Sequence, residues 1–224
     1  MNKKEVFNIY LFRHGQTYYN EKKIFTGWKD SKLTINGKKS ADILAKKLKN
    51  RRIDFAFQTS LSRSRETLKT VLKYHPECRG IITDDRMIER SYGSLEGMSH
   101  SNFKKKIGKK LYDLEVSSYI SYPLSSKEKE KIKELLGEEE FKLVHRSYEI
   151  APPNGESLKD VEKRVKDFIM FLVKFIKKNK VNVAISAHGN SIRMFRKIWE
   201  RKSEEECLKW AIPHTKIYNY KVEI

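Results

Sequence analysis

The sequence predicts an α/β protein in which a mostly parallel sheet lies between two layers of helices. Short apolar runs rich in β-branched and aromatic residues alternate with longer segments whose apolar residues recur every three to four positions. This alternation favours right-handed βαβ units, whose helices cover both faces of a sheet. The length of 224 residues suits one sizeable α/β domain. We therefore expect a single three-layer α/β/α domain over residues 1–224.

Three strands and two helices of this pattern are predicted in the first half of the chain. Each strand is a short apolar run bounded by polar or turn-forming residues. Thr34 is a favourable N-cap for the first helix, whose alanines and leucines recur at helical spacing. The strands are expected at 6–12, 53–57 and 81–82, and the helices at 34–48 and 62–74.

Two further helices and two strands are predicted in the last third of the chain. Ser157 and Asp160 match a capping box, which starts a long helix with apolar residues along one face. The run 181–187 is the clearest strand, a helix follows from about Asn190, and the last strand is expected at 216–222.

The segment 98–154 interrupts this alternation. It is rich in charged residues, has weaker helical patterns at 103–114 and 127–136, and ends at a Pro-Pro-Asn-Gly turn. We expect a helical insertion that lies over the sheet and the active site rather than a second domain.

The composition is strongly basic, with 48 Lys and Arg against 29 Asp and Glu and a net charge of +19. The lysines interleave with apolar residues, which is typical of solvent-facing sides of helices. Such charge also attracts nucleic acids or small polyanions. The sequence has no zinc-finger, helix-turn-helix or RNA-recognition pattern, so a specific nucleic-acid partner is not expected. A small phosphorylated metabolite is the favoured partner, provided that the site chemistry agrees.

The sequence also bears on cellular location. Cys78 and Cys207 are its two cysteines, and they suggest neither a disulfide framework nor a metal site. No run approaches the roughly 18 apolar residues of a membrane-spanning helix. The apolar stretch near the start is too short for a signal peptide. We therefore expect a cytoplasmic protein without a membrane partner.

Four ionisable side chains follow predicted strands. His14 and His188 stand at the carboxyl ends of their strands, Arg63 in the first turn after the second strand, and Glu89 shortly after the third. A single histidine is more often structural than catalytic. Ligands of open α/β sheets bind at the carboxyl ends of the strands, however, so we expect all four side chains in one crevice.

Phosphoryl transfer through a histidine is the chemistry that suits this set. A neutral imidazole is a good nucleophile towards phosphorus when its other nitrogen is held as a donor. Arginines and a second histidine can neutralise the charge on the transferred group. A carboxyl must then take and return the proton of the substrate oxygen, and Glu89 suits that role in a dry site. The sequence has neither a phosphate-binding Walker loop nor a cluster of Asp ligands, so no metal is expected.

Several motifs resemble the histidine phosphatase, or phosphoglycerate mutase-like, superfamily. Arg13-His14-Gly15, Arg63 within SLSRSRET, and Ala187-His188-Gly189 carry this resemblance. Five further stretches, in order along the chain, are similar to cofactor-dependent phosphoglycerate mutases. They are FTGWKDSKLTINGKKSA (25–41), ERSYGSLEG (89–97), RSYE (146–149), GESLKD (155–160) and AHGNSIR (187–193).

The resemblance implies a role for each matching residue. His14 would be phosphorylated, with Arg13, Arg63 and His188 gripping the phosphoryl group and Glu89 moving the proton. The cofactor 2,3-bisphosphoglycerate would prime His14, and a homodimer would fit the family. Asn20 and the backbone at Gly189 and Asn190 would assist the grip. The substrate-binding residues implied are Thr17, Asn20, Thr26, Gly27, Tyr92, His100, His145, Arg146, Gly189 and Asn190.

Two departures from the mutase pattern concern the part of the substrate away from the transferred phosphate: His100 replaces a lysine, and His145 replaces an arginine. A third is that the sequence ends at Ile224 without the tail that mutases carry over the site, and a mutase, unlike a phosphatase, must keep water off phosphohistidine. We expect a phosphoglycerate mutase that interconverts 2- and 3-phosphoglycerate, with a phosphatase of a small phosphorylated metabolite as the alternative. A non-catalytic phosphate-binding or nucleic-acid-binding module is a third interpretation, and the intact set of His14, Glu89 and their partners argues against it.

Overall fold

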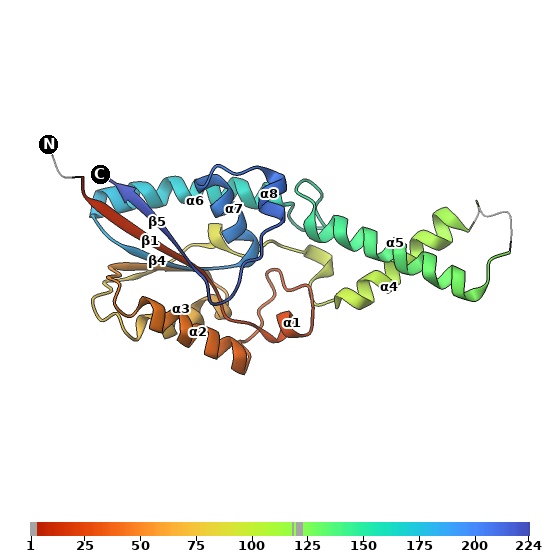
Figure 1. Cartoon of the computed structure of the whole chain (residues 1–224), viewed down its shortest axis with the longest axis horizontal. Coiled ribbons are helices and arrows are strands. Elements are labelled where there is room, and N and C mark those ends of the chain that lie inside the picture. Colours follow the sequence, from red (N-terminus) through yellow and green to blue (C-terminus); the bar gives the residue numbers. More distant parts are fainter. Residues whose placement is uncertain (1–3, 118, 120–122) are drawn as a thin grey trace.

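A five-stranded sheet forms the centre of the computed structural model, which describes residues 4–117, 119 and 123–224 (Figure 1). The strand order is β3-β2-β4-β1-β5. The first four of these strands run parallel, whereas β5 pairs antiparallel with β1. This confirms the predicted, mostly parallel sheet. The strands are β1 (Val6–Arg13), β2 (Phe55–Gln58), β3 (Ile81–Thr83), β4 (Val183–Ala187) and β5 (Ile217–Glu223).

Two pairs of helices cover the faces of this sheet, as the sequence predicts. α2 and α3 lie on one face, and α6 and α7 on the other (Figure 1). Side chains at the starts of α2 and α6 cap their backbones, with Thr34 accepting from the Gly37 N–H and Ser157 from the Asp160 N–H. The helices are α2 (Ile35–Leu48), α3 (Ser62–Leu72), α6 (Leu158–Asn179) and α7 (Gly189–Trp199).

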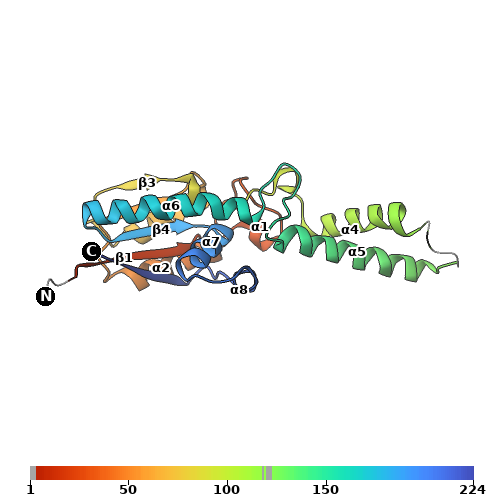
Figure 2. The same cartoon turned by 90° about the horizontal axis from the view of Figure 1, so that it is seen from above.

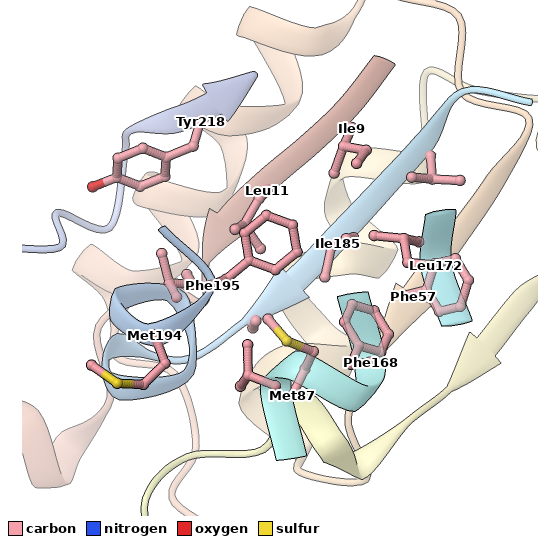
Figure 3. Packing of buried hydrophobic residues seen from close by; sticks show 14 of the residues in the cluster. Ile9, Leu11, Phe57, Met87, Phe168, Leu172, Ile185, Met194, Phe195 and Tyr218 are labelled. Carbon is pink, nitrogen blue, oxygen red and sulfur yellow. The ribbon is translucent and has the colours of Figure 1, made fainter. Parts of the chain in front are cut away.

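The residues of β1 alternate between two cores because successive side chains of a strand point to opposite faces. Ile9 and Leu11 are buried with residues of α6 and α7. Tyr10 and Phe12 are buried with residues of α2 and α3. Figure 3 shows the first core, where Phe168 of α6 and other large side chains pack on the sheet. Burial on both faces fixes the strand in place, so the position of its carboxyl end is well defined.

Several short elements were not predicted, because each is too short for a periodic apolar pattern. They lie in the connections at the carboxyl ends of the strands or near β5. The structure adds α1 (Tyr18–Glu21), the 3₁₀ turns η1 (Asp85–Met87) and η2 (Gly93–Leu95), and α8 (Glu204–Leu208). Within the ranges that the structure describes, no helix is both long and apolar enough to span a bilayer.

The insertion forms a helical hairpin that extends away from the sheet (Figure 2). It consists of α4 (His100–Leu111), the π-helical turn η3 (Tyr112–Val116) and α5 (Ser126–Arg146). The two helices touch closely where a Cβ atom on Gly108 would lie 2.0 Å from the Lys133 carbonyl oxygen. The hairpin thus packs mainly on itself. Contrary to the expectation of an insertion lying over the sheet, only its base borders the site described below.

Candidate active site

A pocket of about 490 Å³ opens at the carboxyl ends of β1 and β4. Arg13, Glu89 and Gly189 line it, whereas His14, Arg63 and His188 are buried beside it and at most 2 % exposed. The rings of His14 and His188 lie 4.9 Å apart, centre to centre. The four side chains predicted at strand ends therefore do converge, because the parallel strands that carry them end at one edge of the sheet.

The imidazole of His14 is held in one orientation and one tautomer. Its Nδ1–H donates to the carbonyl oxygen of Gly15 at 2.7 Å, which leaves the lone pair on Nε2. Gly15 also lets this loop lie close to the first turn of α2, since a Cβ there would be 2.2 Å from the Gly37 carbonyl oxygen. Burial, followed by nearby His188 and Arg63, lowers the pKa of His14 well below 6.5. The ring is therefore neutral at neutral pH and suited to act as a nucleophile.

His188 lies at the N-terminus of α7, directly after β4. Its Nε2 lies 2.8 Å from the hydroxyl of Thr59, and its buried Nδ1 has no hydrogen-bond partner in the described part of the chain. Burial, then the charges of Arg63 and Arg13, lower its pKa well below 6.5. A bound anion such as a protonated phosphate group would give Nδ1 of His188 a hydrogen-bond partner, and its negative charge would offset the nearby arginines.

The two arginines are anchored through their terminal nitrogens. Arg13 donates from Nη1 to the Ile212 carbonyl at 3.0 Å. Arg63 donates to the carbonyls of Lys29 and Gly27 at 3.0 and 2.7 Å. The Nε atoms of both arginines are buried and unpaired among the residues described. These donors are rigidly placed and still require an acceptor, such as a phosphoryl oxygen.

Glu89 is bound by the backbone at the start of α7. Its two carboxylate oxygens accept N–H groups of Gly189 and Asn190, both at 3.0 Å, and of Arg90 at 2.9 Å. The positive end of the helix dipole adds to this stabilisation of the carboxylate. The family resemblance implied that the Gly189 and Asn190 backbone assists in binding the phosphoryl group, but in this structure those N–H groups donate to Glu89.

Most of the predicted substrate-binding residues line the pocket. Thr17 does not: it is fully buried, and its hydroxyl accepts from the Asn20 N–H as the N-cap of α1. Its role here is to shape the loop that carries Asn20. The predicted residues found in the lining are Asn20, Thr26, Gly27, Tyr92, His100, His145, Arg146, Gly189 and Asn190.

At the base of the hairpin, two imidazoles, those of His100 and His145, line the pocket next to Arg146. His145 stacks between Phe141 and Tyr92, with ring centres 5.0 and 6.1 Å away. Burial, and then Arg146, lower the pKa of His145 to about 3. Burial and Lys104 also lower the pKa of His100. Both imidazoles are therefore neutral at neutral pH, where a lysine or arginine would be charged.

The half-buried imidazole of His145 should make stability sensitive to acid. Its pKa is about 3 in the folded state and 6.5 in an unfolded chain, so below pH 6.5 the unfolded state binds more protons and gains stability. The free energy of unfolding of the parent should fall when the pH is lowered from 7 to 5. In His145→Phe this fall should be smaller, by up to about 2 kcal/mol. Chemical denaturation at both pH values measures this.

The matched control for this prediction is Leu143→Gln, on an exposed part of the same helix. It should keep the parental difference between the two pH values. An equal loss in His145→Phe and the parent would show that His145 is not buried as a neutral group.

The pocket also contains residues that the sequence did not single out. Arg193 donates from Nη2 to the Trp210 carbonyl at 3.0 Å, and also to the side chain of Asn190. Arg193 ends the AHGNSIR stretch that resembles the mutases, so this motif could have indicated Arg193 as a residue of the site. His214 and Lys23 had no such signal, since they lie in irregular segments brought to the pocket by the fold.

The fold and the site define an α/β protein with a buried histidine pair, two anchored arginines and a carboxylate beside one pocket. Among residues 4–117, 119 and 123–224, no group of three His, Cys, Asp or Glu side chains could hold a metal ion. The sequence profile of the histidine phosphatase superfamily (branch 1) matches residues 9–123 and 120–223. The chain belongs to this enzyme superfamily.

Relatives with assigned functions are similar over nearly the whole chain. The 2,3-bisphosphoglycerate-dependent phosphoglycerate mutase of Methanococcus vannielii is 35% identical over 208 residues, which cover 92% of this chain and 86% of the relative. Among solved structures, a phosphoglycerate mutase from Bacillus anthracis has a TM-score of 0.68 at 20% identity and covers 99% of this chain and 92% of its own. A putative alpha-ribazole-5'-P phosphatase from Escherichia coli has a TM-score of 0.69 at 17% identity, with coverages of 95% and 89%. At these identities the structures establish the shared fold.

Proposed function

We propose that the chain is a phosphoglycerate mutase that interconverts 2- and 3-phosphoglycerate through a phosphohistidine at His14. The observation that carries this proposal is the neutral imidazole of His14, held by Gly15 with its Nε2 lone pair beside unpaired arginine donors. The mutase among the relatives, similar over 92% of the chain, supports the substrate assignment.

The roles of the residues follow from their contacts. Nε2 of His14 attacks phosphorus, and the Nε atoms of Arg13 and Arg63 bind the equatorial oxygens on which negative charge accumulates. When His188 takes up a proton from the bound phosphate, its Nδ1–H donates a hydrogen bond to the same group. Glu89 accepts the proton of the attacking substrate hydroxyl and returns it to the leaving oxygen in the reverse direction.

The pocket also fits the cofactor 2,3-bisphosphoglycerate, which supplies the phosphoryl group on His14 when it binds. A second anionic group would meet cations at the far side of the pocket, where Arg146, Arg193 and Lys23 contribute to the lining. The buried Nε of Arg193 has no acceptor within the described chain. These residues would hold the group that stays on the substrate while His14 exchanges the other.

One observation favours the second candidate, a phosphatase of a small phosphorylated metabolite. His100 and His145 are neutral. They therefore attract a negatively charged substrate group at the base of the hairpin less strongly than a lysine and an arginine at these positions would. A mutase must also keep water away from phosphohistidine, whereas a phosphatase need not.

A single assay separates these two functions. The protein is incubated with 3-phosphoglycerate, with and without 2,3-bisphosphoglycerate, and both 2-phosphoglycerate and inorganic phosphate are measured. Formation of 2-phosphoglycerate that the bisphosphate stimulates is the expected result. Release of phosphate without isomerisation would replace the mutase by the phosphatase.

Restoring a cation at the hairpin base should tighten substrate binding. We expect His100→Lys to lower KM for 3-phosphoglycerate by about 3- to 10-fold, in the range of one charge-assisted hydrogen bond. Steady-state kinetics measure it, with His100→Gln as the neutral control that leaves KM near the parental value. If KM is the same in His100→Lys, then other cations such as Arg146 already saturate the distal group.

A further inference from the structure

His214 lies next to the proposed nucleophile, although it is 200 residues away in the sequence. It belongs to the segment that connects α8 to β5, and it lines the pocket together with Ile212 and Pro213. Its ring centre is 5.8 Å from that of His14. The tertiary fold thus brings a third imidazole to the reaction centre.

The hydrogen bonding of His214 determines which of its nitrogens carries the lone pair. Nδ1 lies 2.6 Å from the carbonyl oxygen of His14, and a carbonyl can only accept, so Nδ1 carries the hydrogen. Nε2 is therefore an acceptor. No side chain or backbone group of the described residues donates to this atom, and the residue is only partly buried.

Glu89 is the acceptor assigned above to the substrate hydroxyl, and its oxygens also accept three backbone N–H groups. His188 is buried, and its Nε2 contacts the hydroxyl of Thr59. His214 lines the pocket and is only partly buried, and its Nε2 has no donor among the described residues. Burial and the charge of Arg13 lower the pKa of His214 to about 4, so its lone pair is available at neutral pH.

We propose that His214 is a further catalytic residue, a base that activates water against phosphorylated His14 when no substrate hydroxyl is bound. The water oxygen forms a bond to phosphorus, and the P–N bond breaks with its electron pair returning to Nε2 of His14. The water proton moves to Nε2 of His214, which later releases it to solvent. The products are inorganic phosphate and the unmodified enzyme. This inference rests on the phosphohistidine of the proposed function.

The sharpest test replaces His214 by asparagine. The amide of asparagine can still donate to the His14 carbonyl as Nδ1–H does, but it cannot take a proton. Enzyme phosphorylated with radiolabelled 2,3-bisphosphoglycerate is desalted rapidly, and the loss of acid-labile protein phosphate is followed with and without 3-phosphoglycerate. His214→Asn is expected to slow hydrolysis about 100-fold, as the loss of a general base does, while transfer to 3-phosphoglycerate stays within about 3-fold.

Two further variants separate a catalytic from a structural role. Thr215→Ala changes the neighbouring residue, which does not line the pocket, and should hydrolyse at the parental rate. His214→Ala should be slow, and added imidazole should restore its hydrolysis, because a small base can occupy the vacated space. A residue that only supports the loop would not be rescued in this way.

The outcomes that would overturn the proposal are distinct from failure of the proposed function. Hydrolysis at the parental rate in His214→Asn, or an equal loss of hydrolysis and transfer, removes the catalytic role of His214 and leaves phospho-His14 intact. A parent phosphoenzyme that is stable to water has the same consequence. Absence of phosphorylation in the parent protein itself would instead overturn the phosphohistidine, and the inference with it.

Discussion

Replacing His14 by glutamine is expected to lower turnover by about 10⁴-fold or more and to abolish acid-labile protein phosphate. The amide nitrogen of glutamine has no lone pair available for attack on phosphorus, and losses of this size are typical when a nucleophile is removed. Because His14 is 2 % exposed, the size of glutamine keeps the site filled. Turnover and labelling with radioactive 2,3-bisphosphoglycerate are measured together, and thermal unfolding confirms that the variant is folded.

The matched control for this variant is His75→Gln. His75 is equally buried at 3 % exposed, and its Nδ1 contacts Glu77 outside the pocket. Its replacement should leave turnover and labelling unchanged. Persistent turnover or acid-labile phosphate in His14→Gln would contradict the phosphohistidine mechanism.

The second large effect is expected at Glu89. Glu89→Gln should lower turnover of phosphoglycerate by about 10²- to 10⁴-fold, the usual contribution of a general acid–base group. An amide cannot take the substrate proton. It also offers one oxygen to the three backbone N–H groups of Gly189, Asn190 and Arg90, where the carboxylate offers two.

The choice of substrate distinguishes a proton-transfer role from a structural one. With p-nitrophenyl phosphate the leaving phenolate needs little protonation, so the loss in Glu89→Gln should be smaller than with phosphoglycerate. Glu77→Gln is the control, because Glu77 also accepts a backbone N–H, that of Ile53, but lies outside the pocket. An equal loss with both substrates would show that Glu89 only holds the start of α7 in place.

The repeating parts of the fold were predictable because their signals are local. The apolar period of the long helix, with Ser157 as its cap, and the apolar run of β4 depend on neighbouring residues only. Short elements such as α1 and α8 gave no such signal, since they have too few residues for a period to show. Their positions depend on contacts with distant parts of the chain.

The direction of the hairpin could not be predicted for a related reason. The helical pattern indicated helices in the segment 98–154, but it cannot show what a helix packs against. Gly108 and Gly137 let α4 and α5 pack closely on one another, whereas at the base of the hairpin Phe103 and Val144 are buried with Phe25, Tyr92 and Leu95. The hairpin can therefore leave the sheet, with only its base reaching the pocket.

The sequence by itself determined that His14, Arg63, Glu89 and His188 meet, because each follows a strand and parallel strands end at one edge of a sheet. The tertiary structure alone decided the bonding of these groups. In the folded chain the Gly189 and Asn190 N–H groups donate to Glu89, and Thr17 caps α1 instead of lining the pocket. His214 lies next to His14. The physical reason is that the positions of the strands along the chain follow from local patterns, whereas the direction of a hydrogen bond depends on side chains far apart in sequence and packed together in the folded chain.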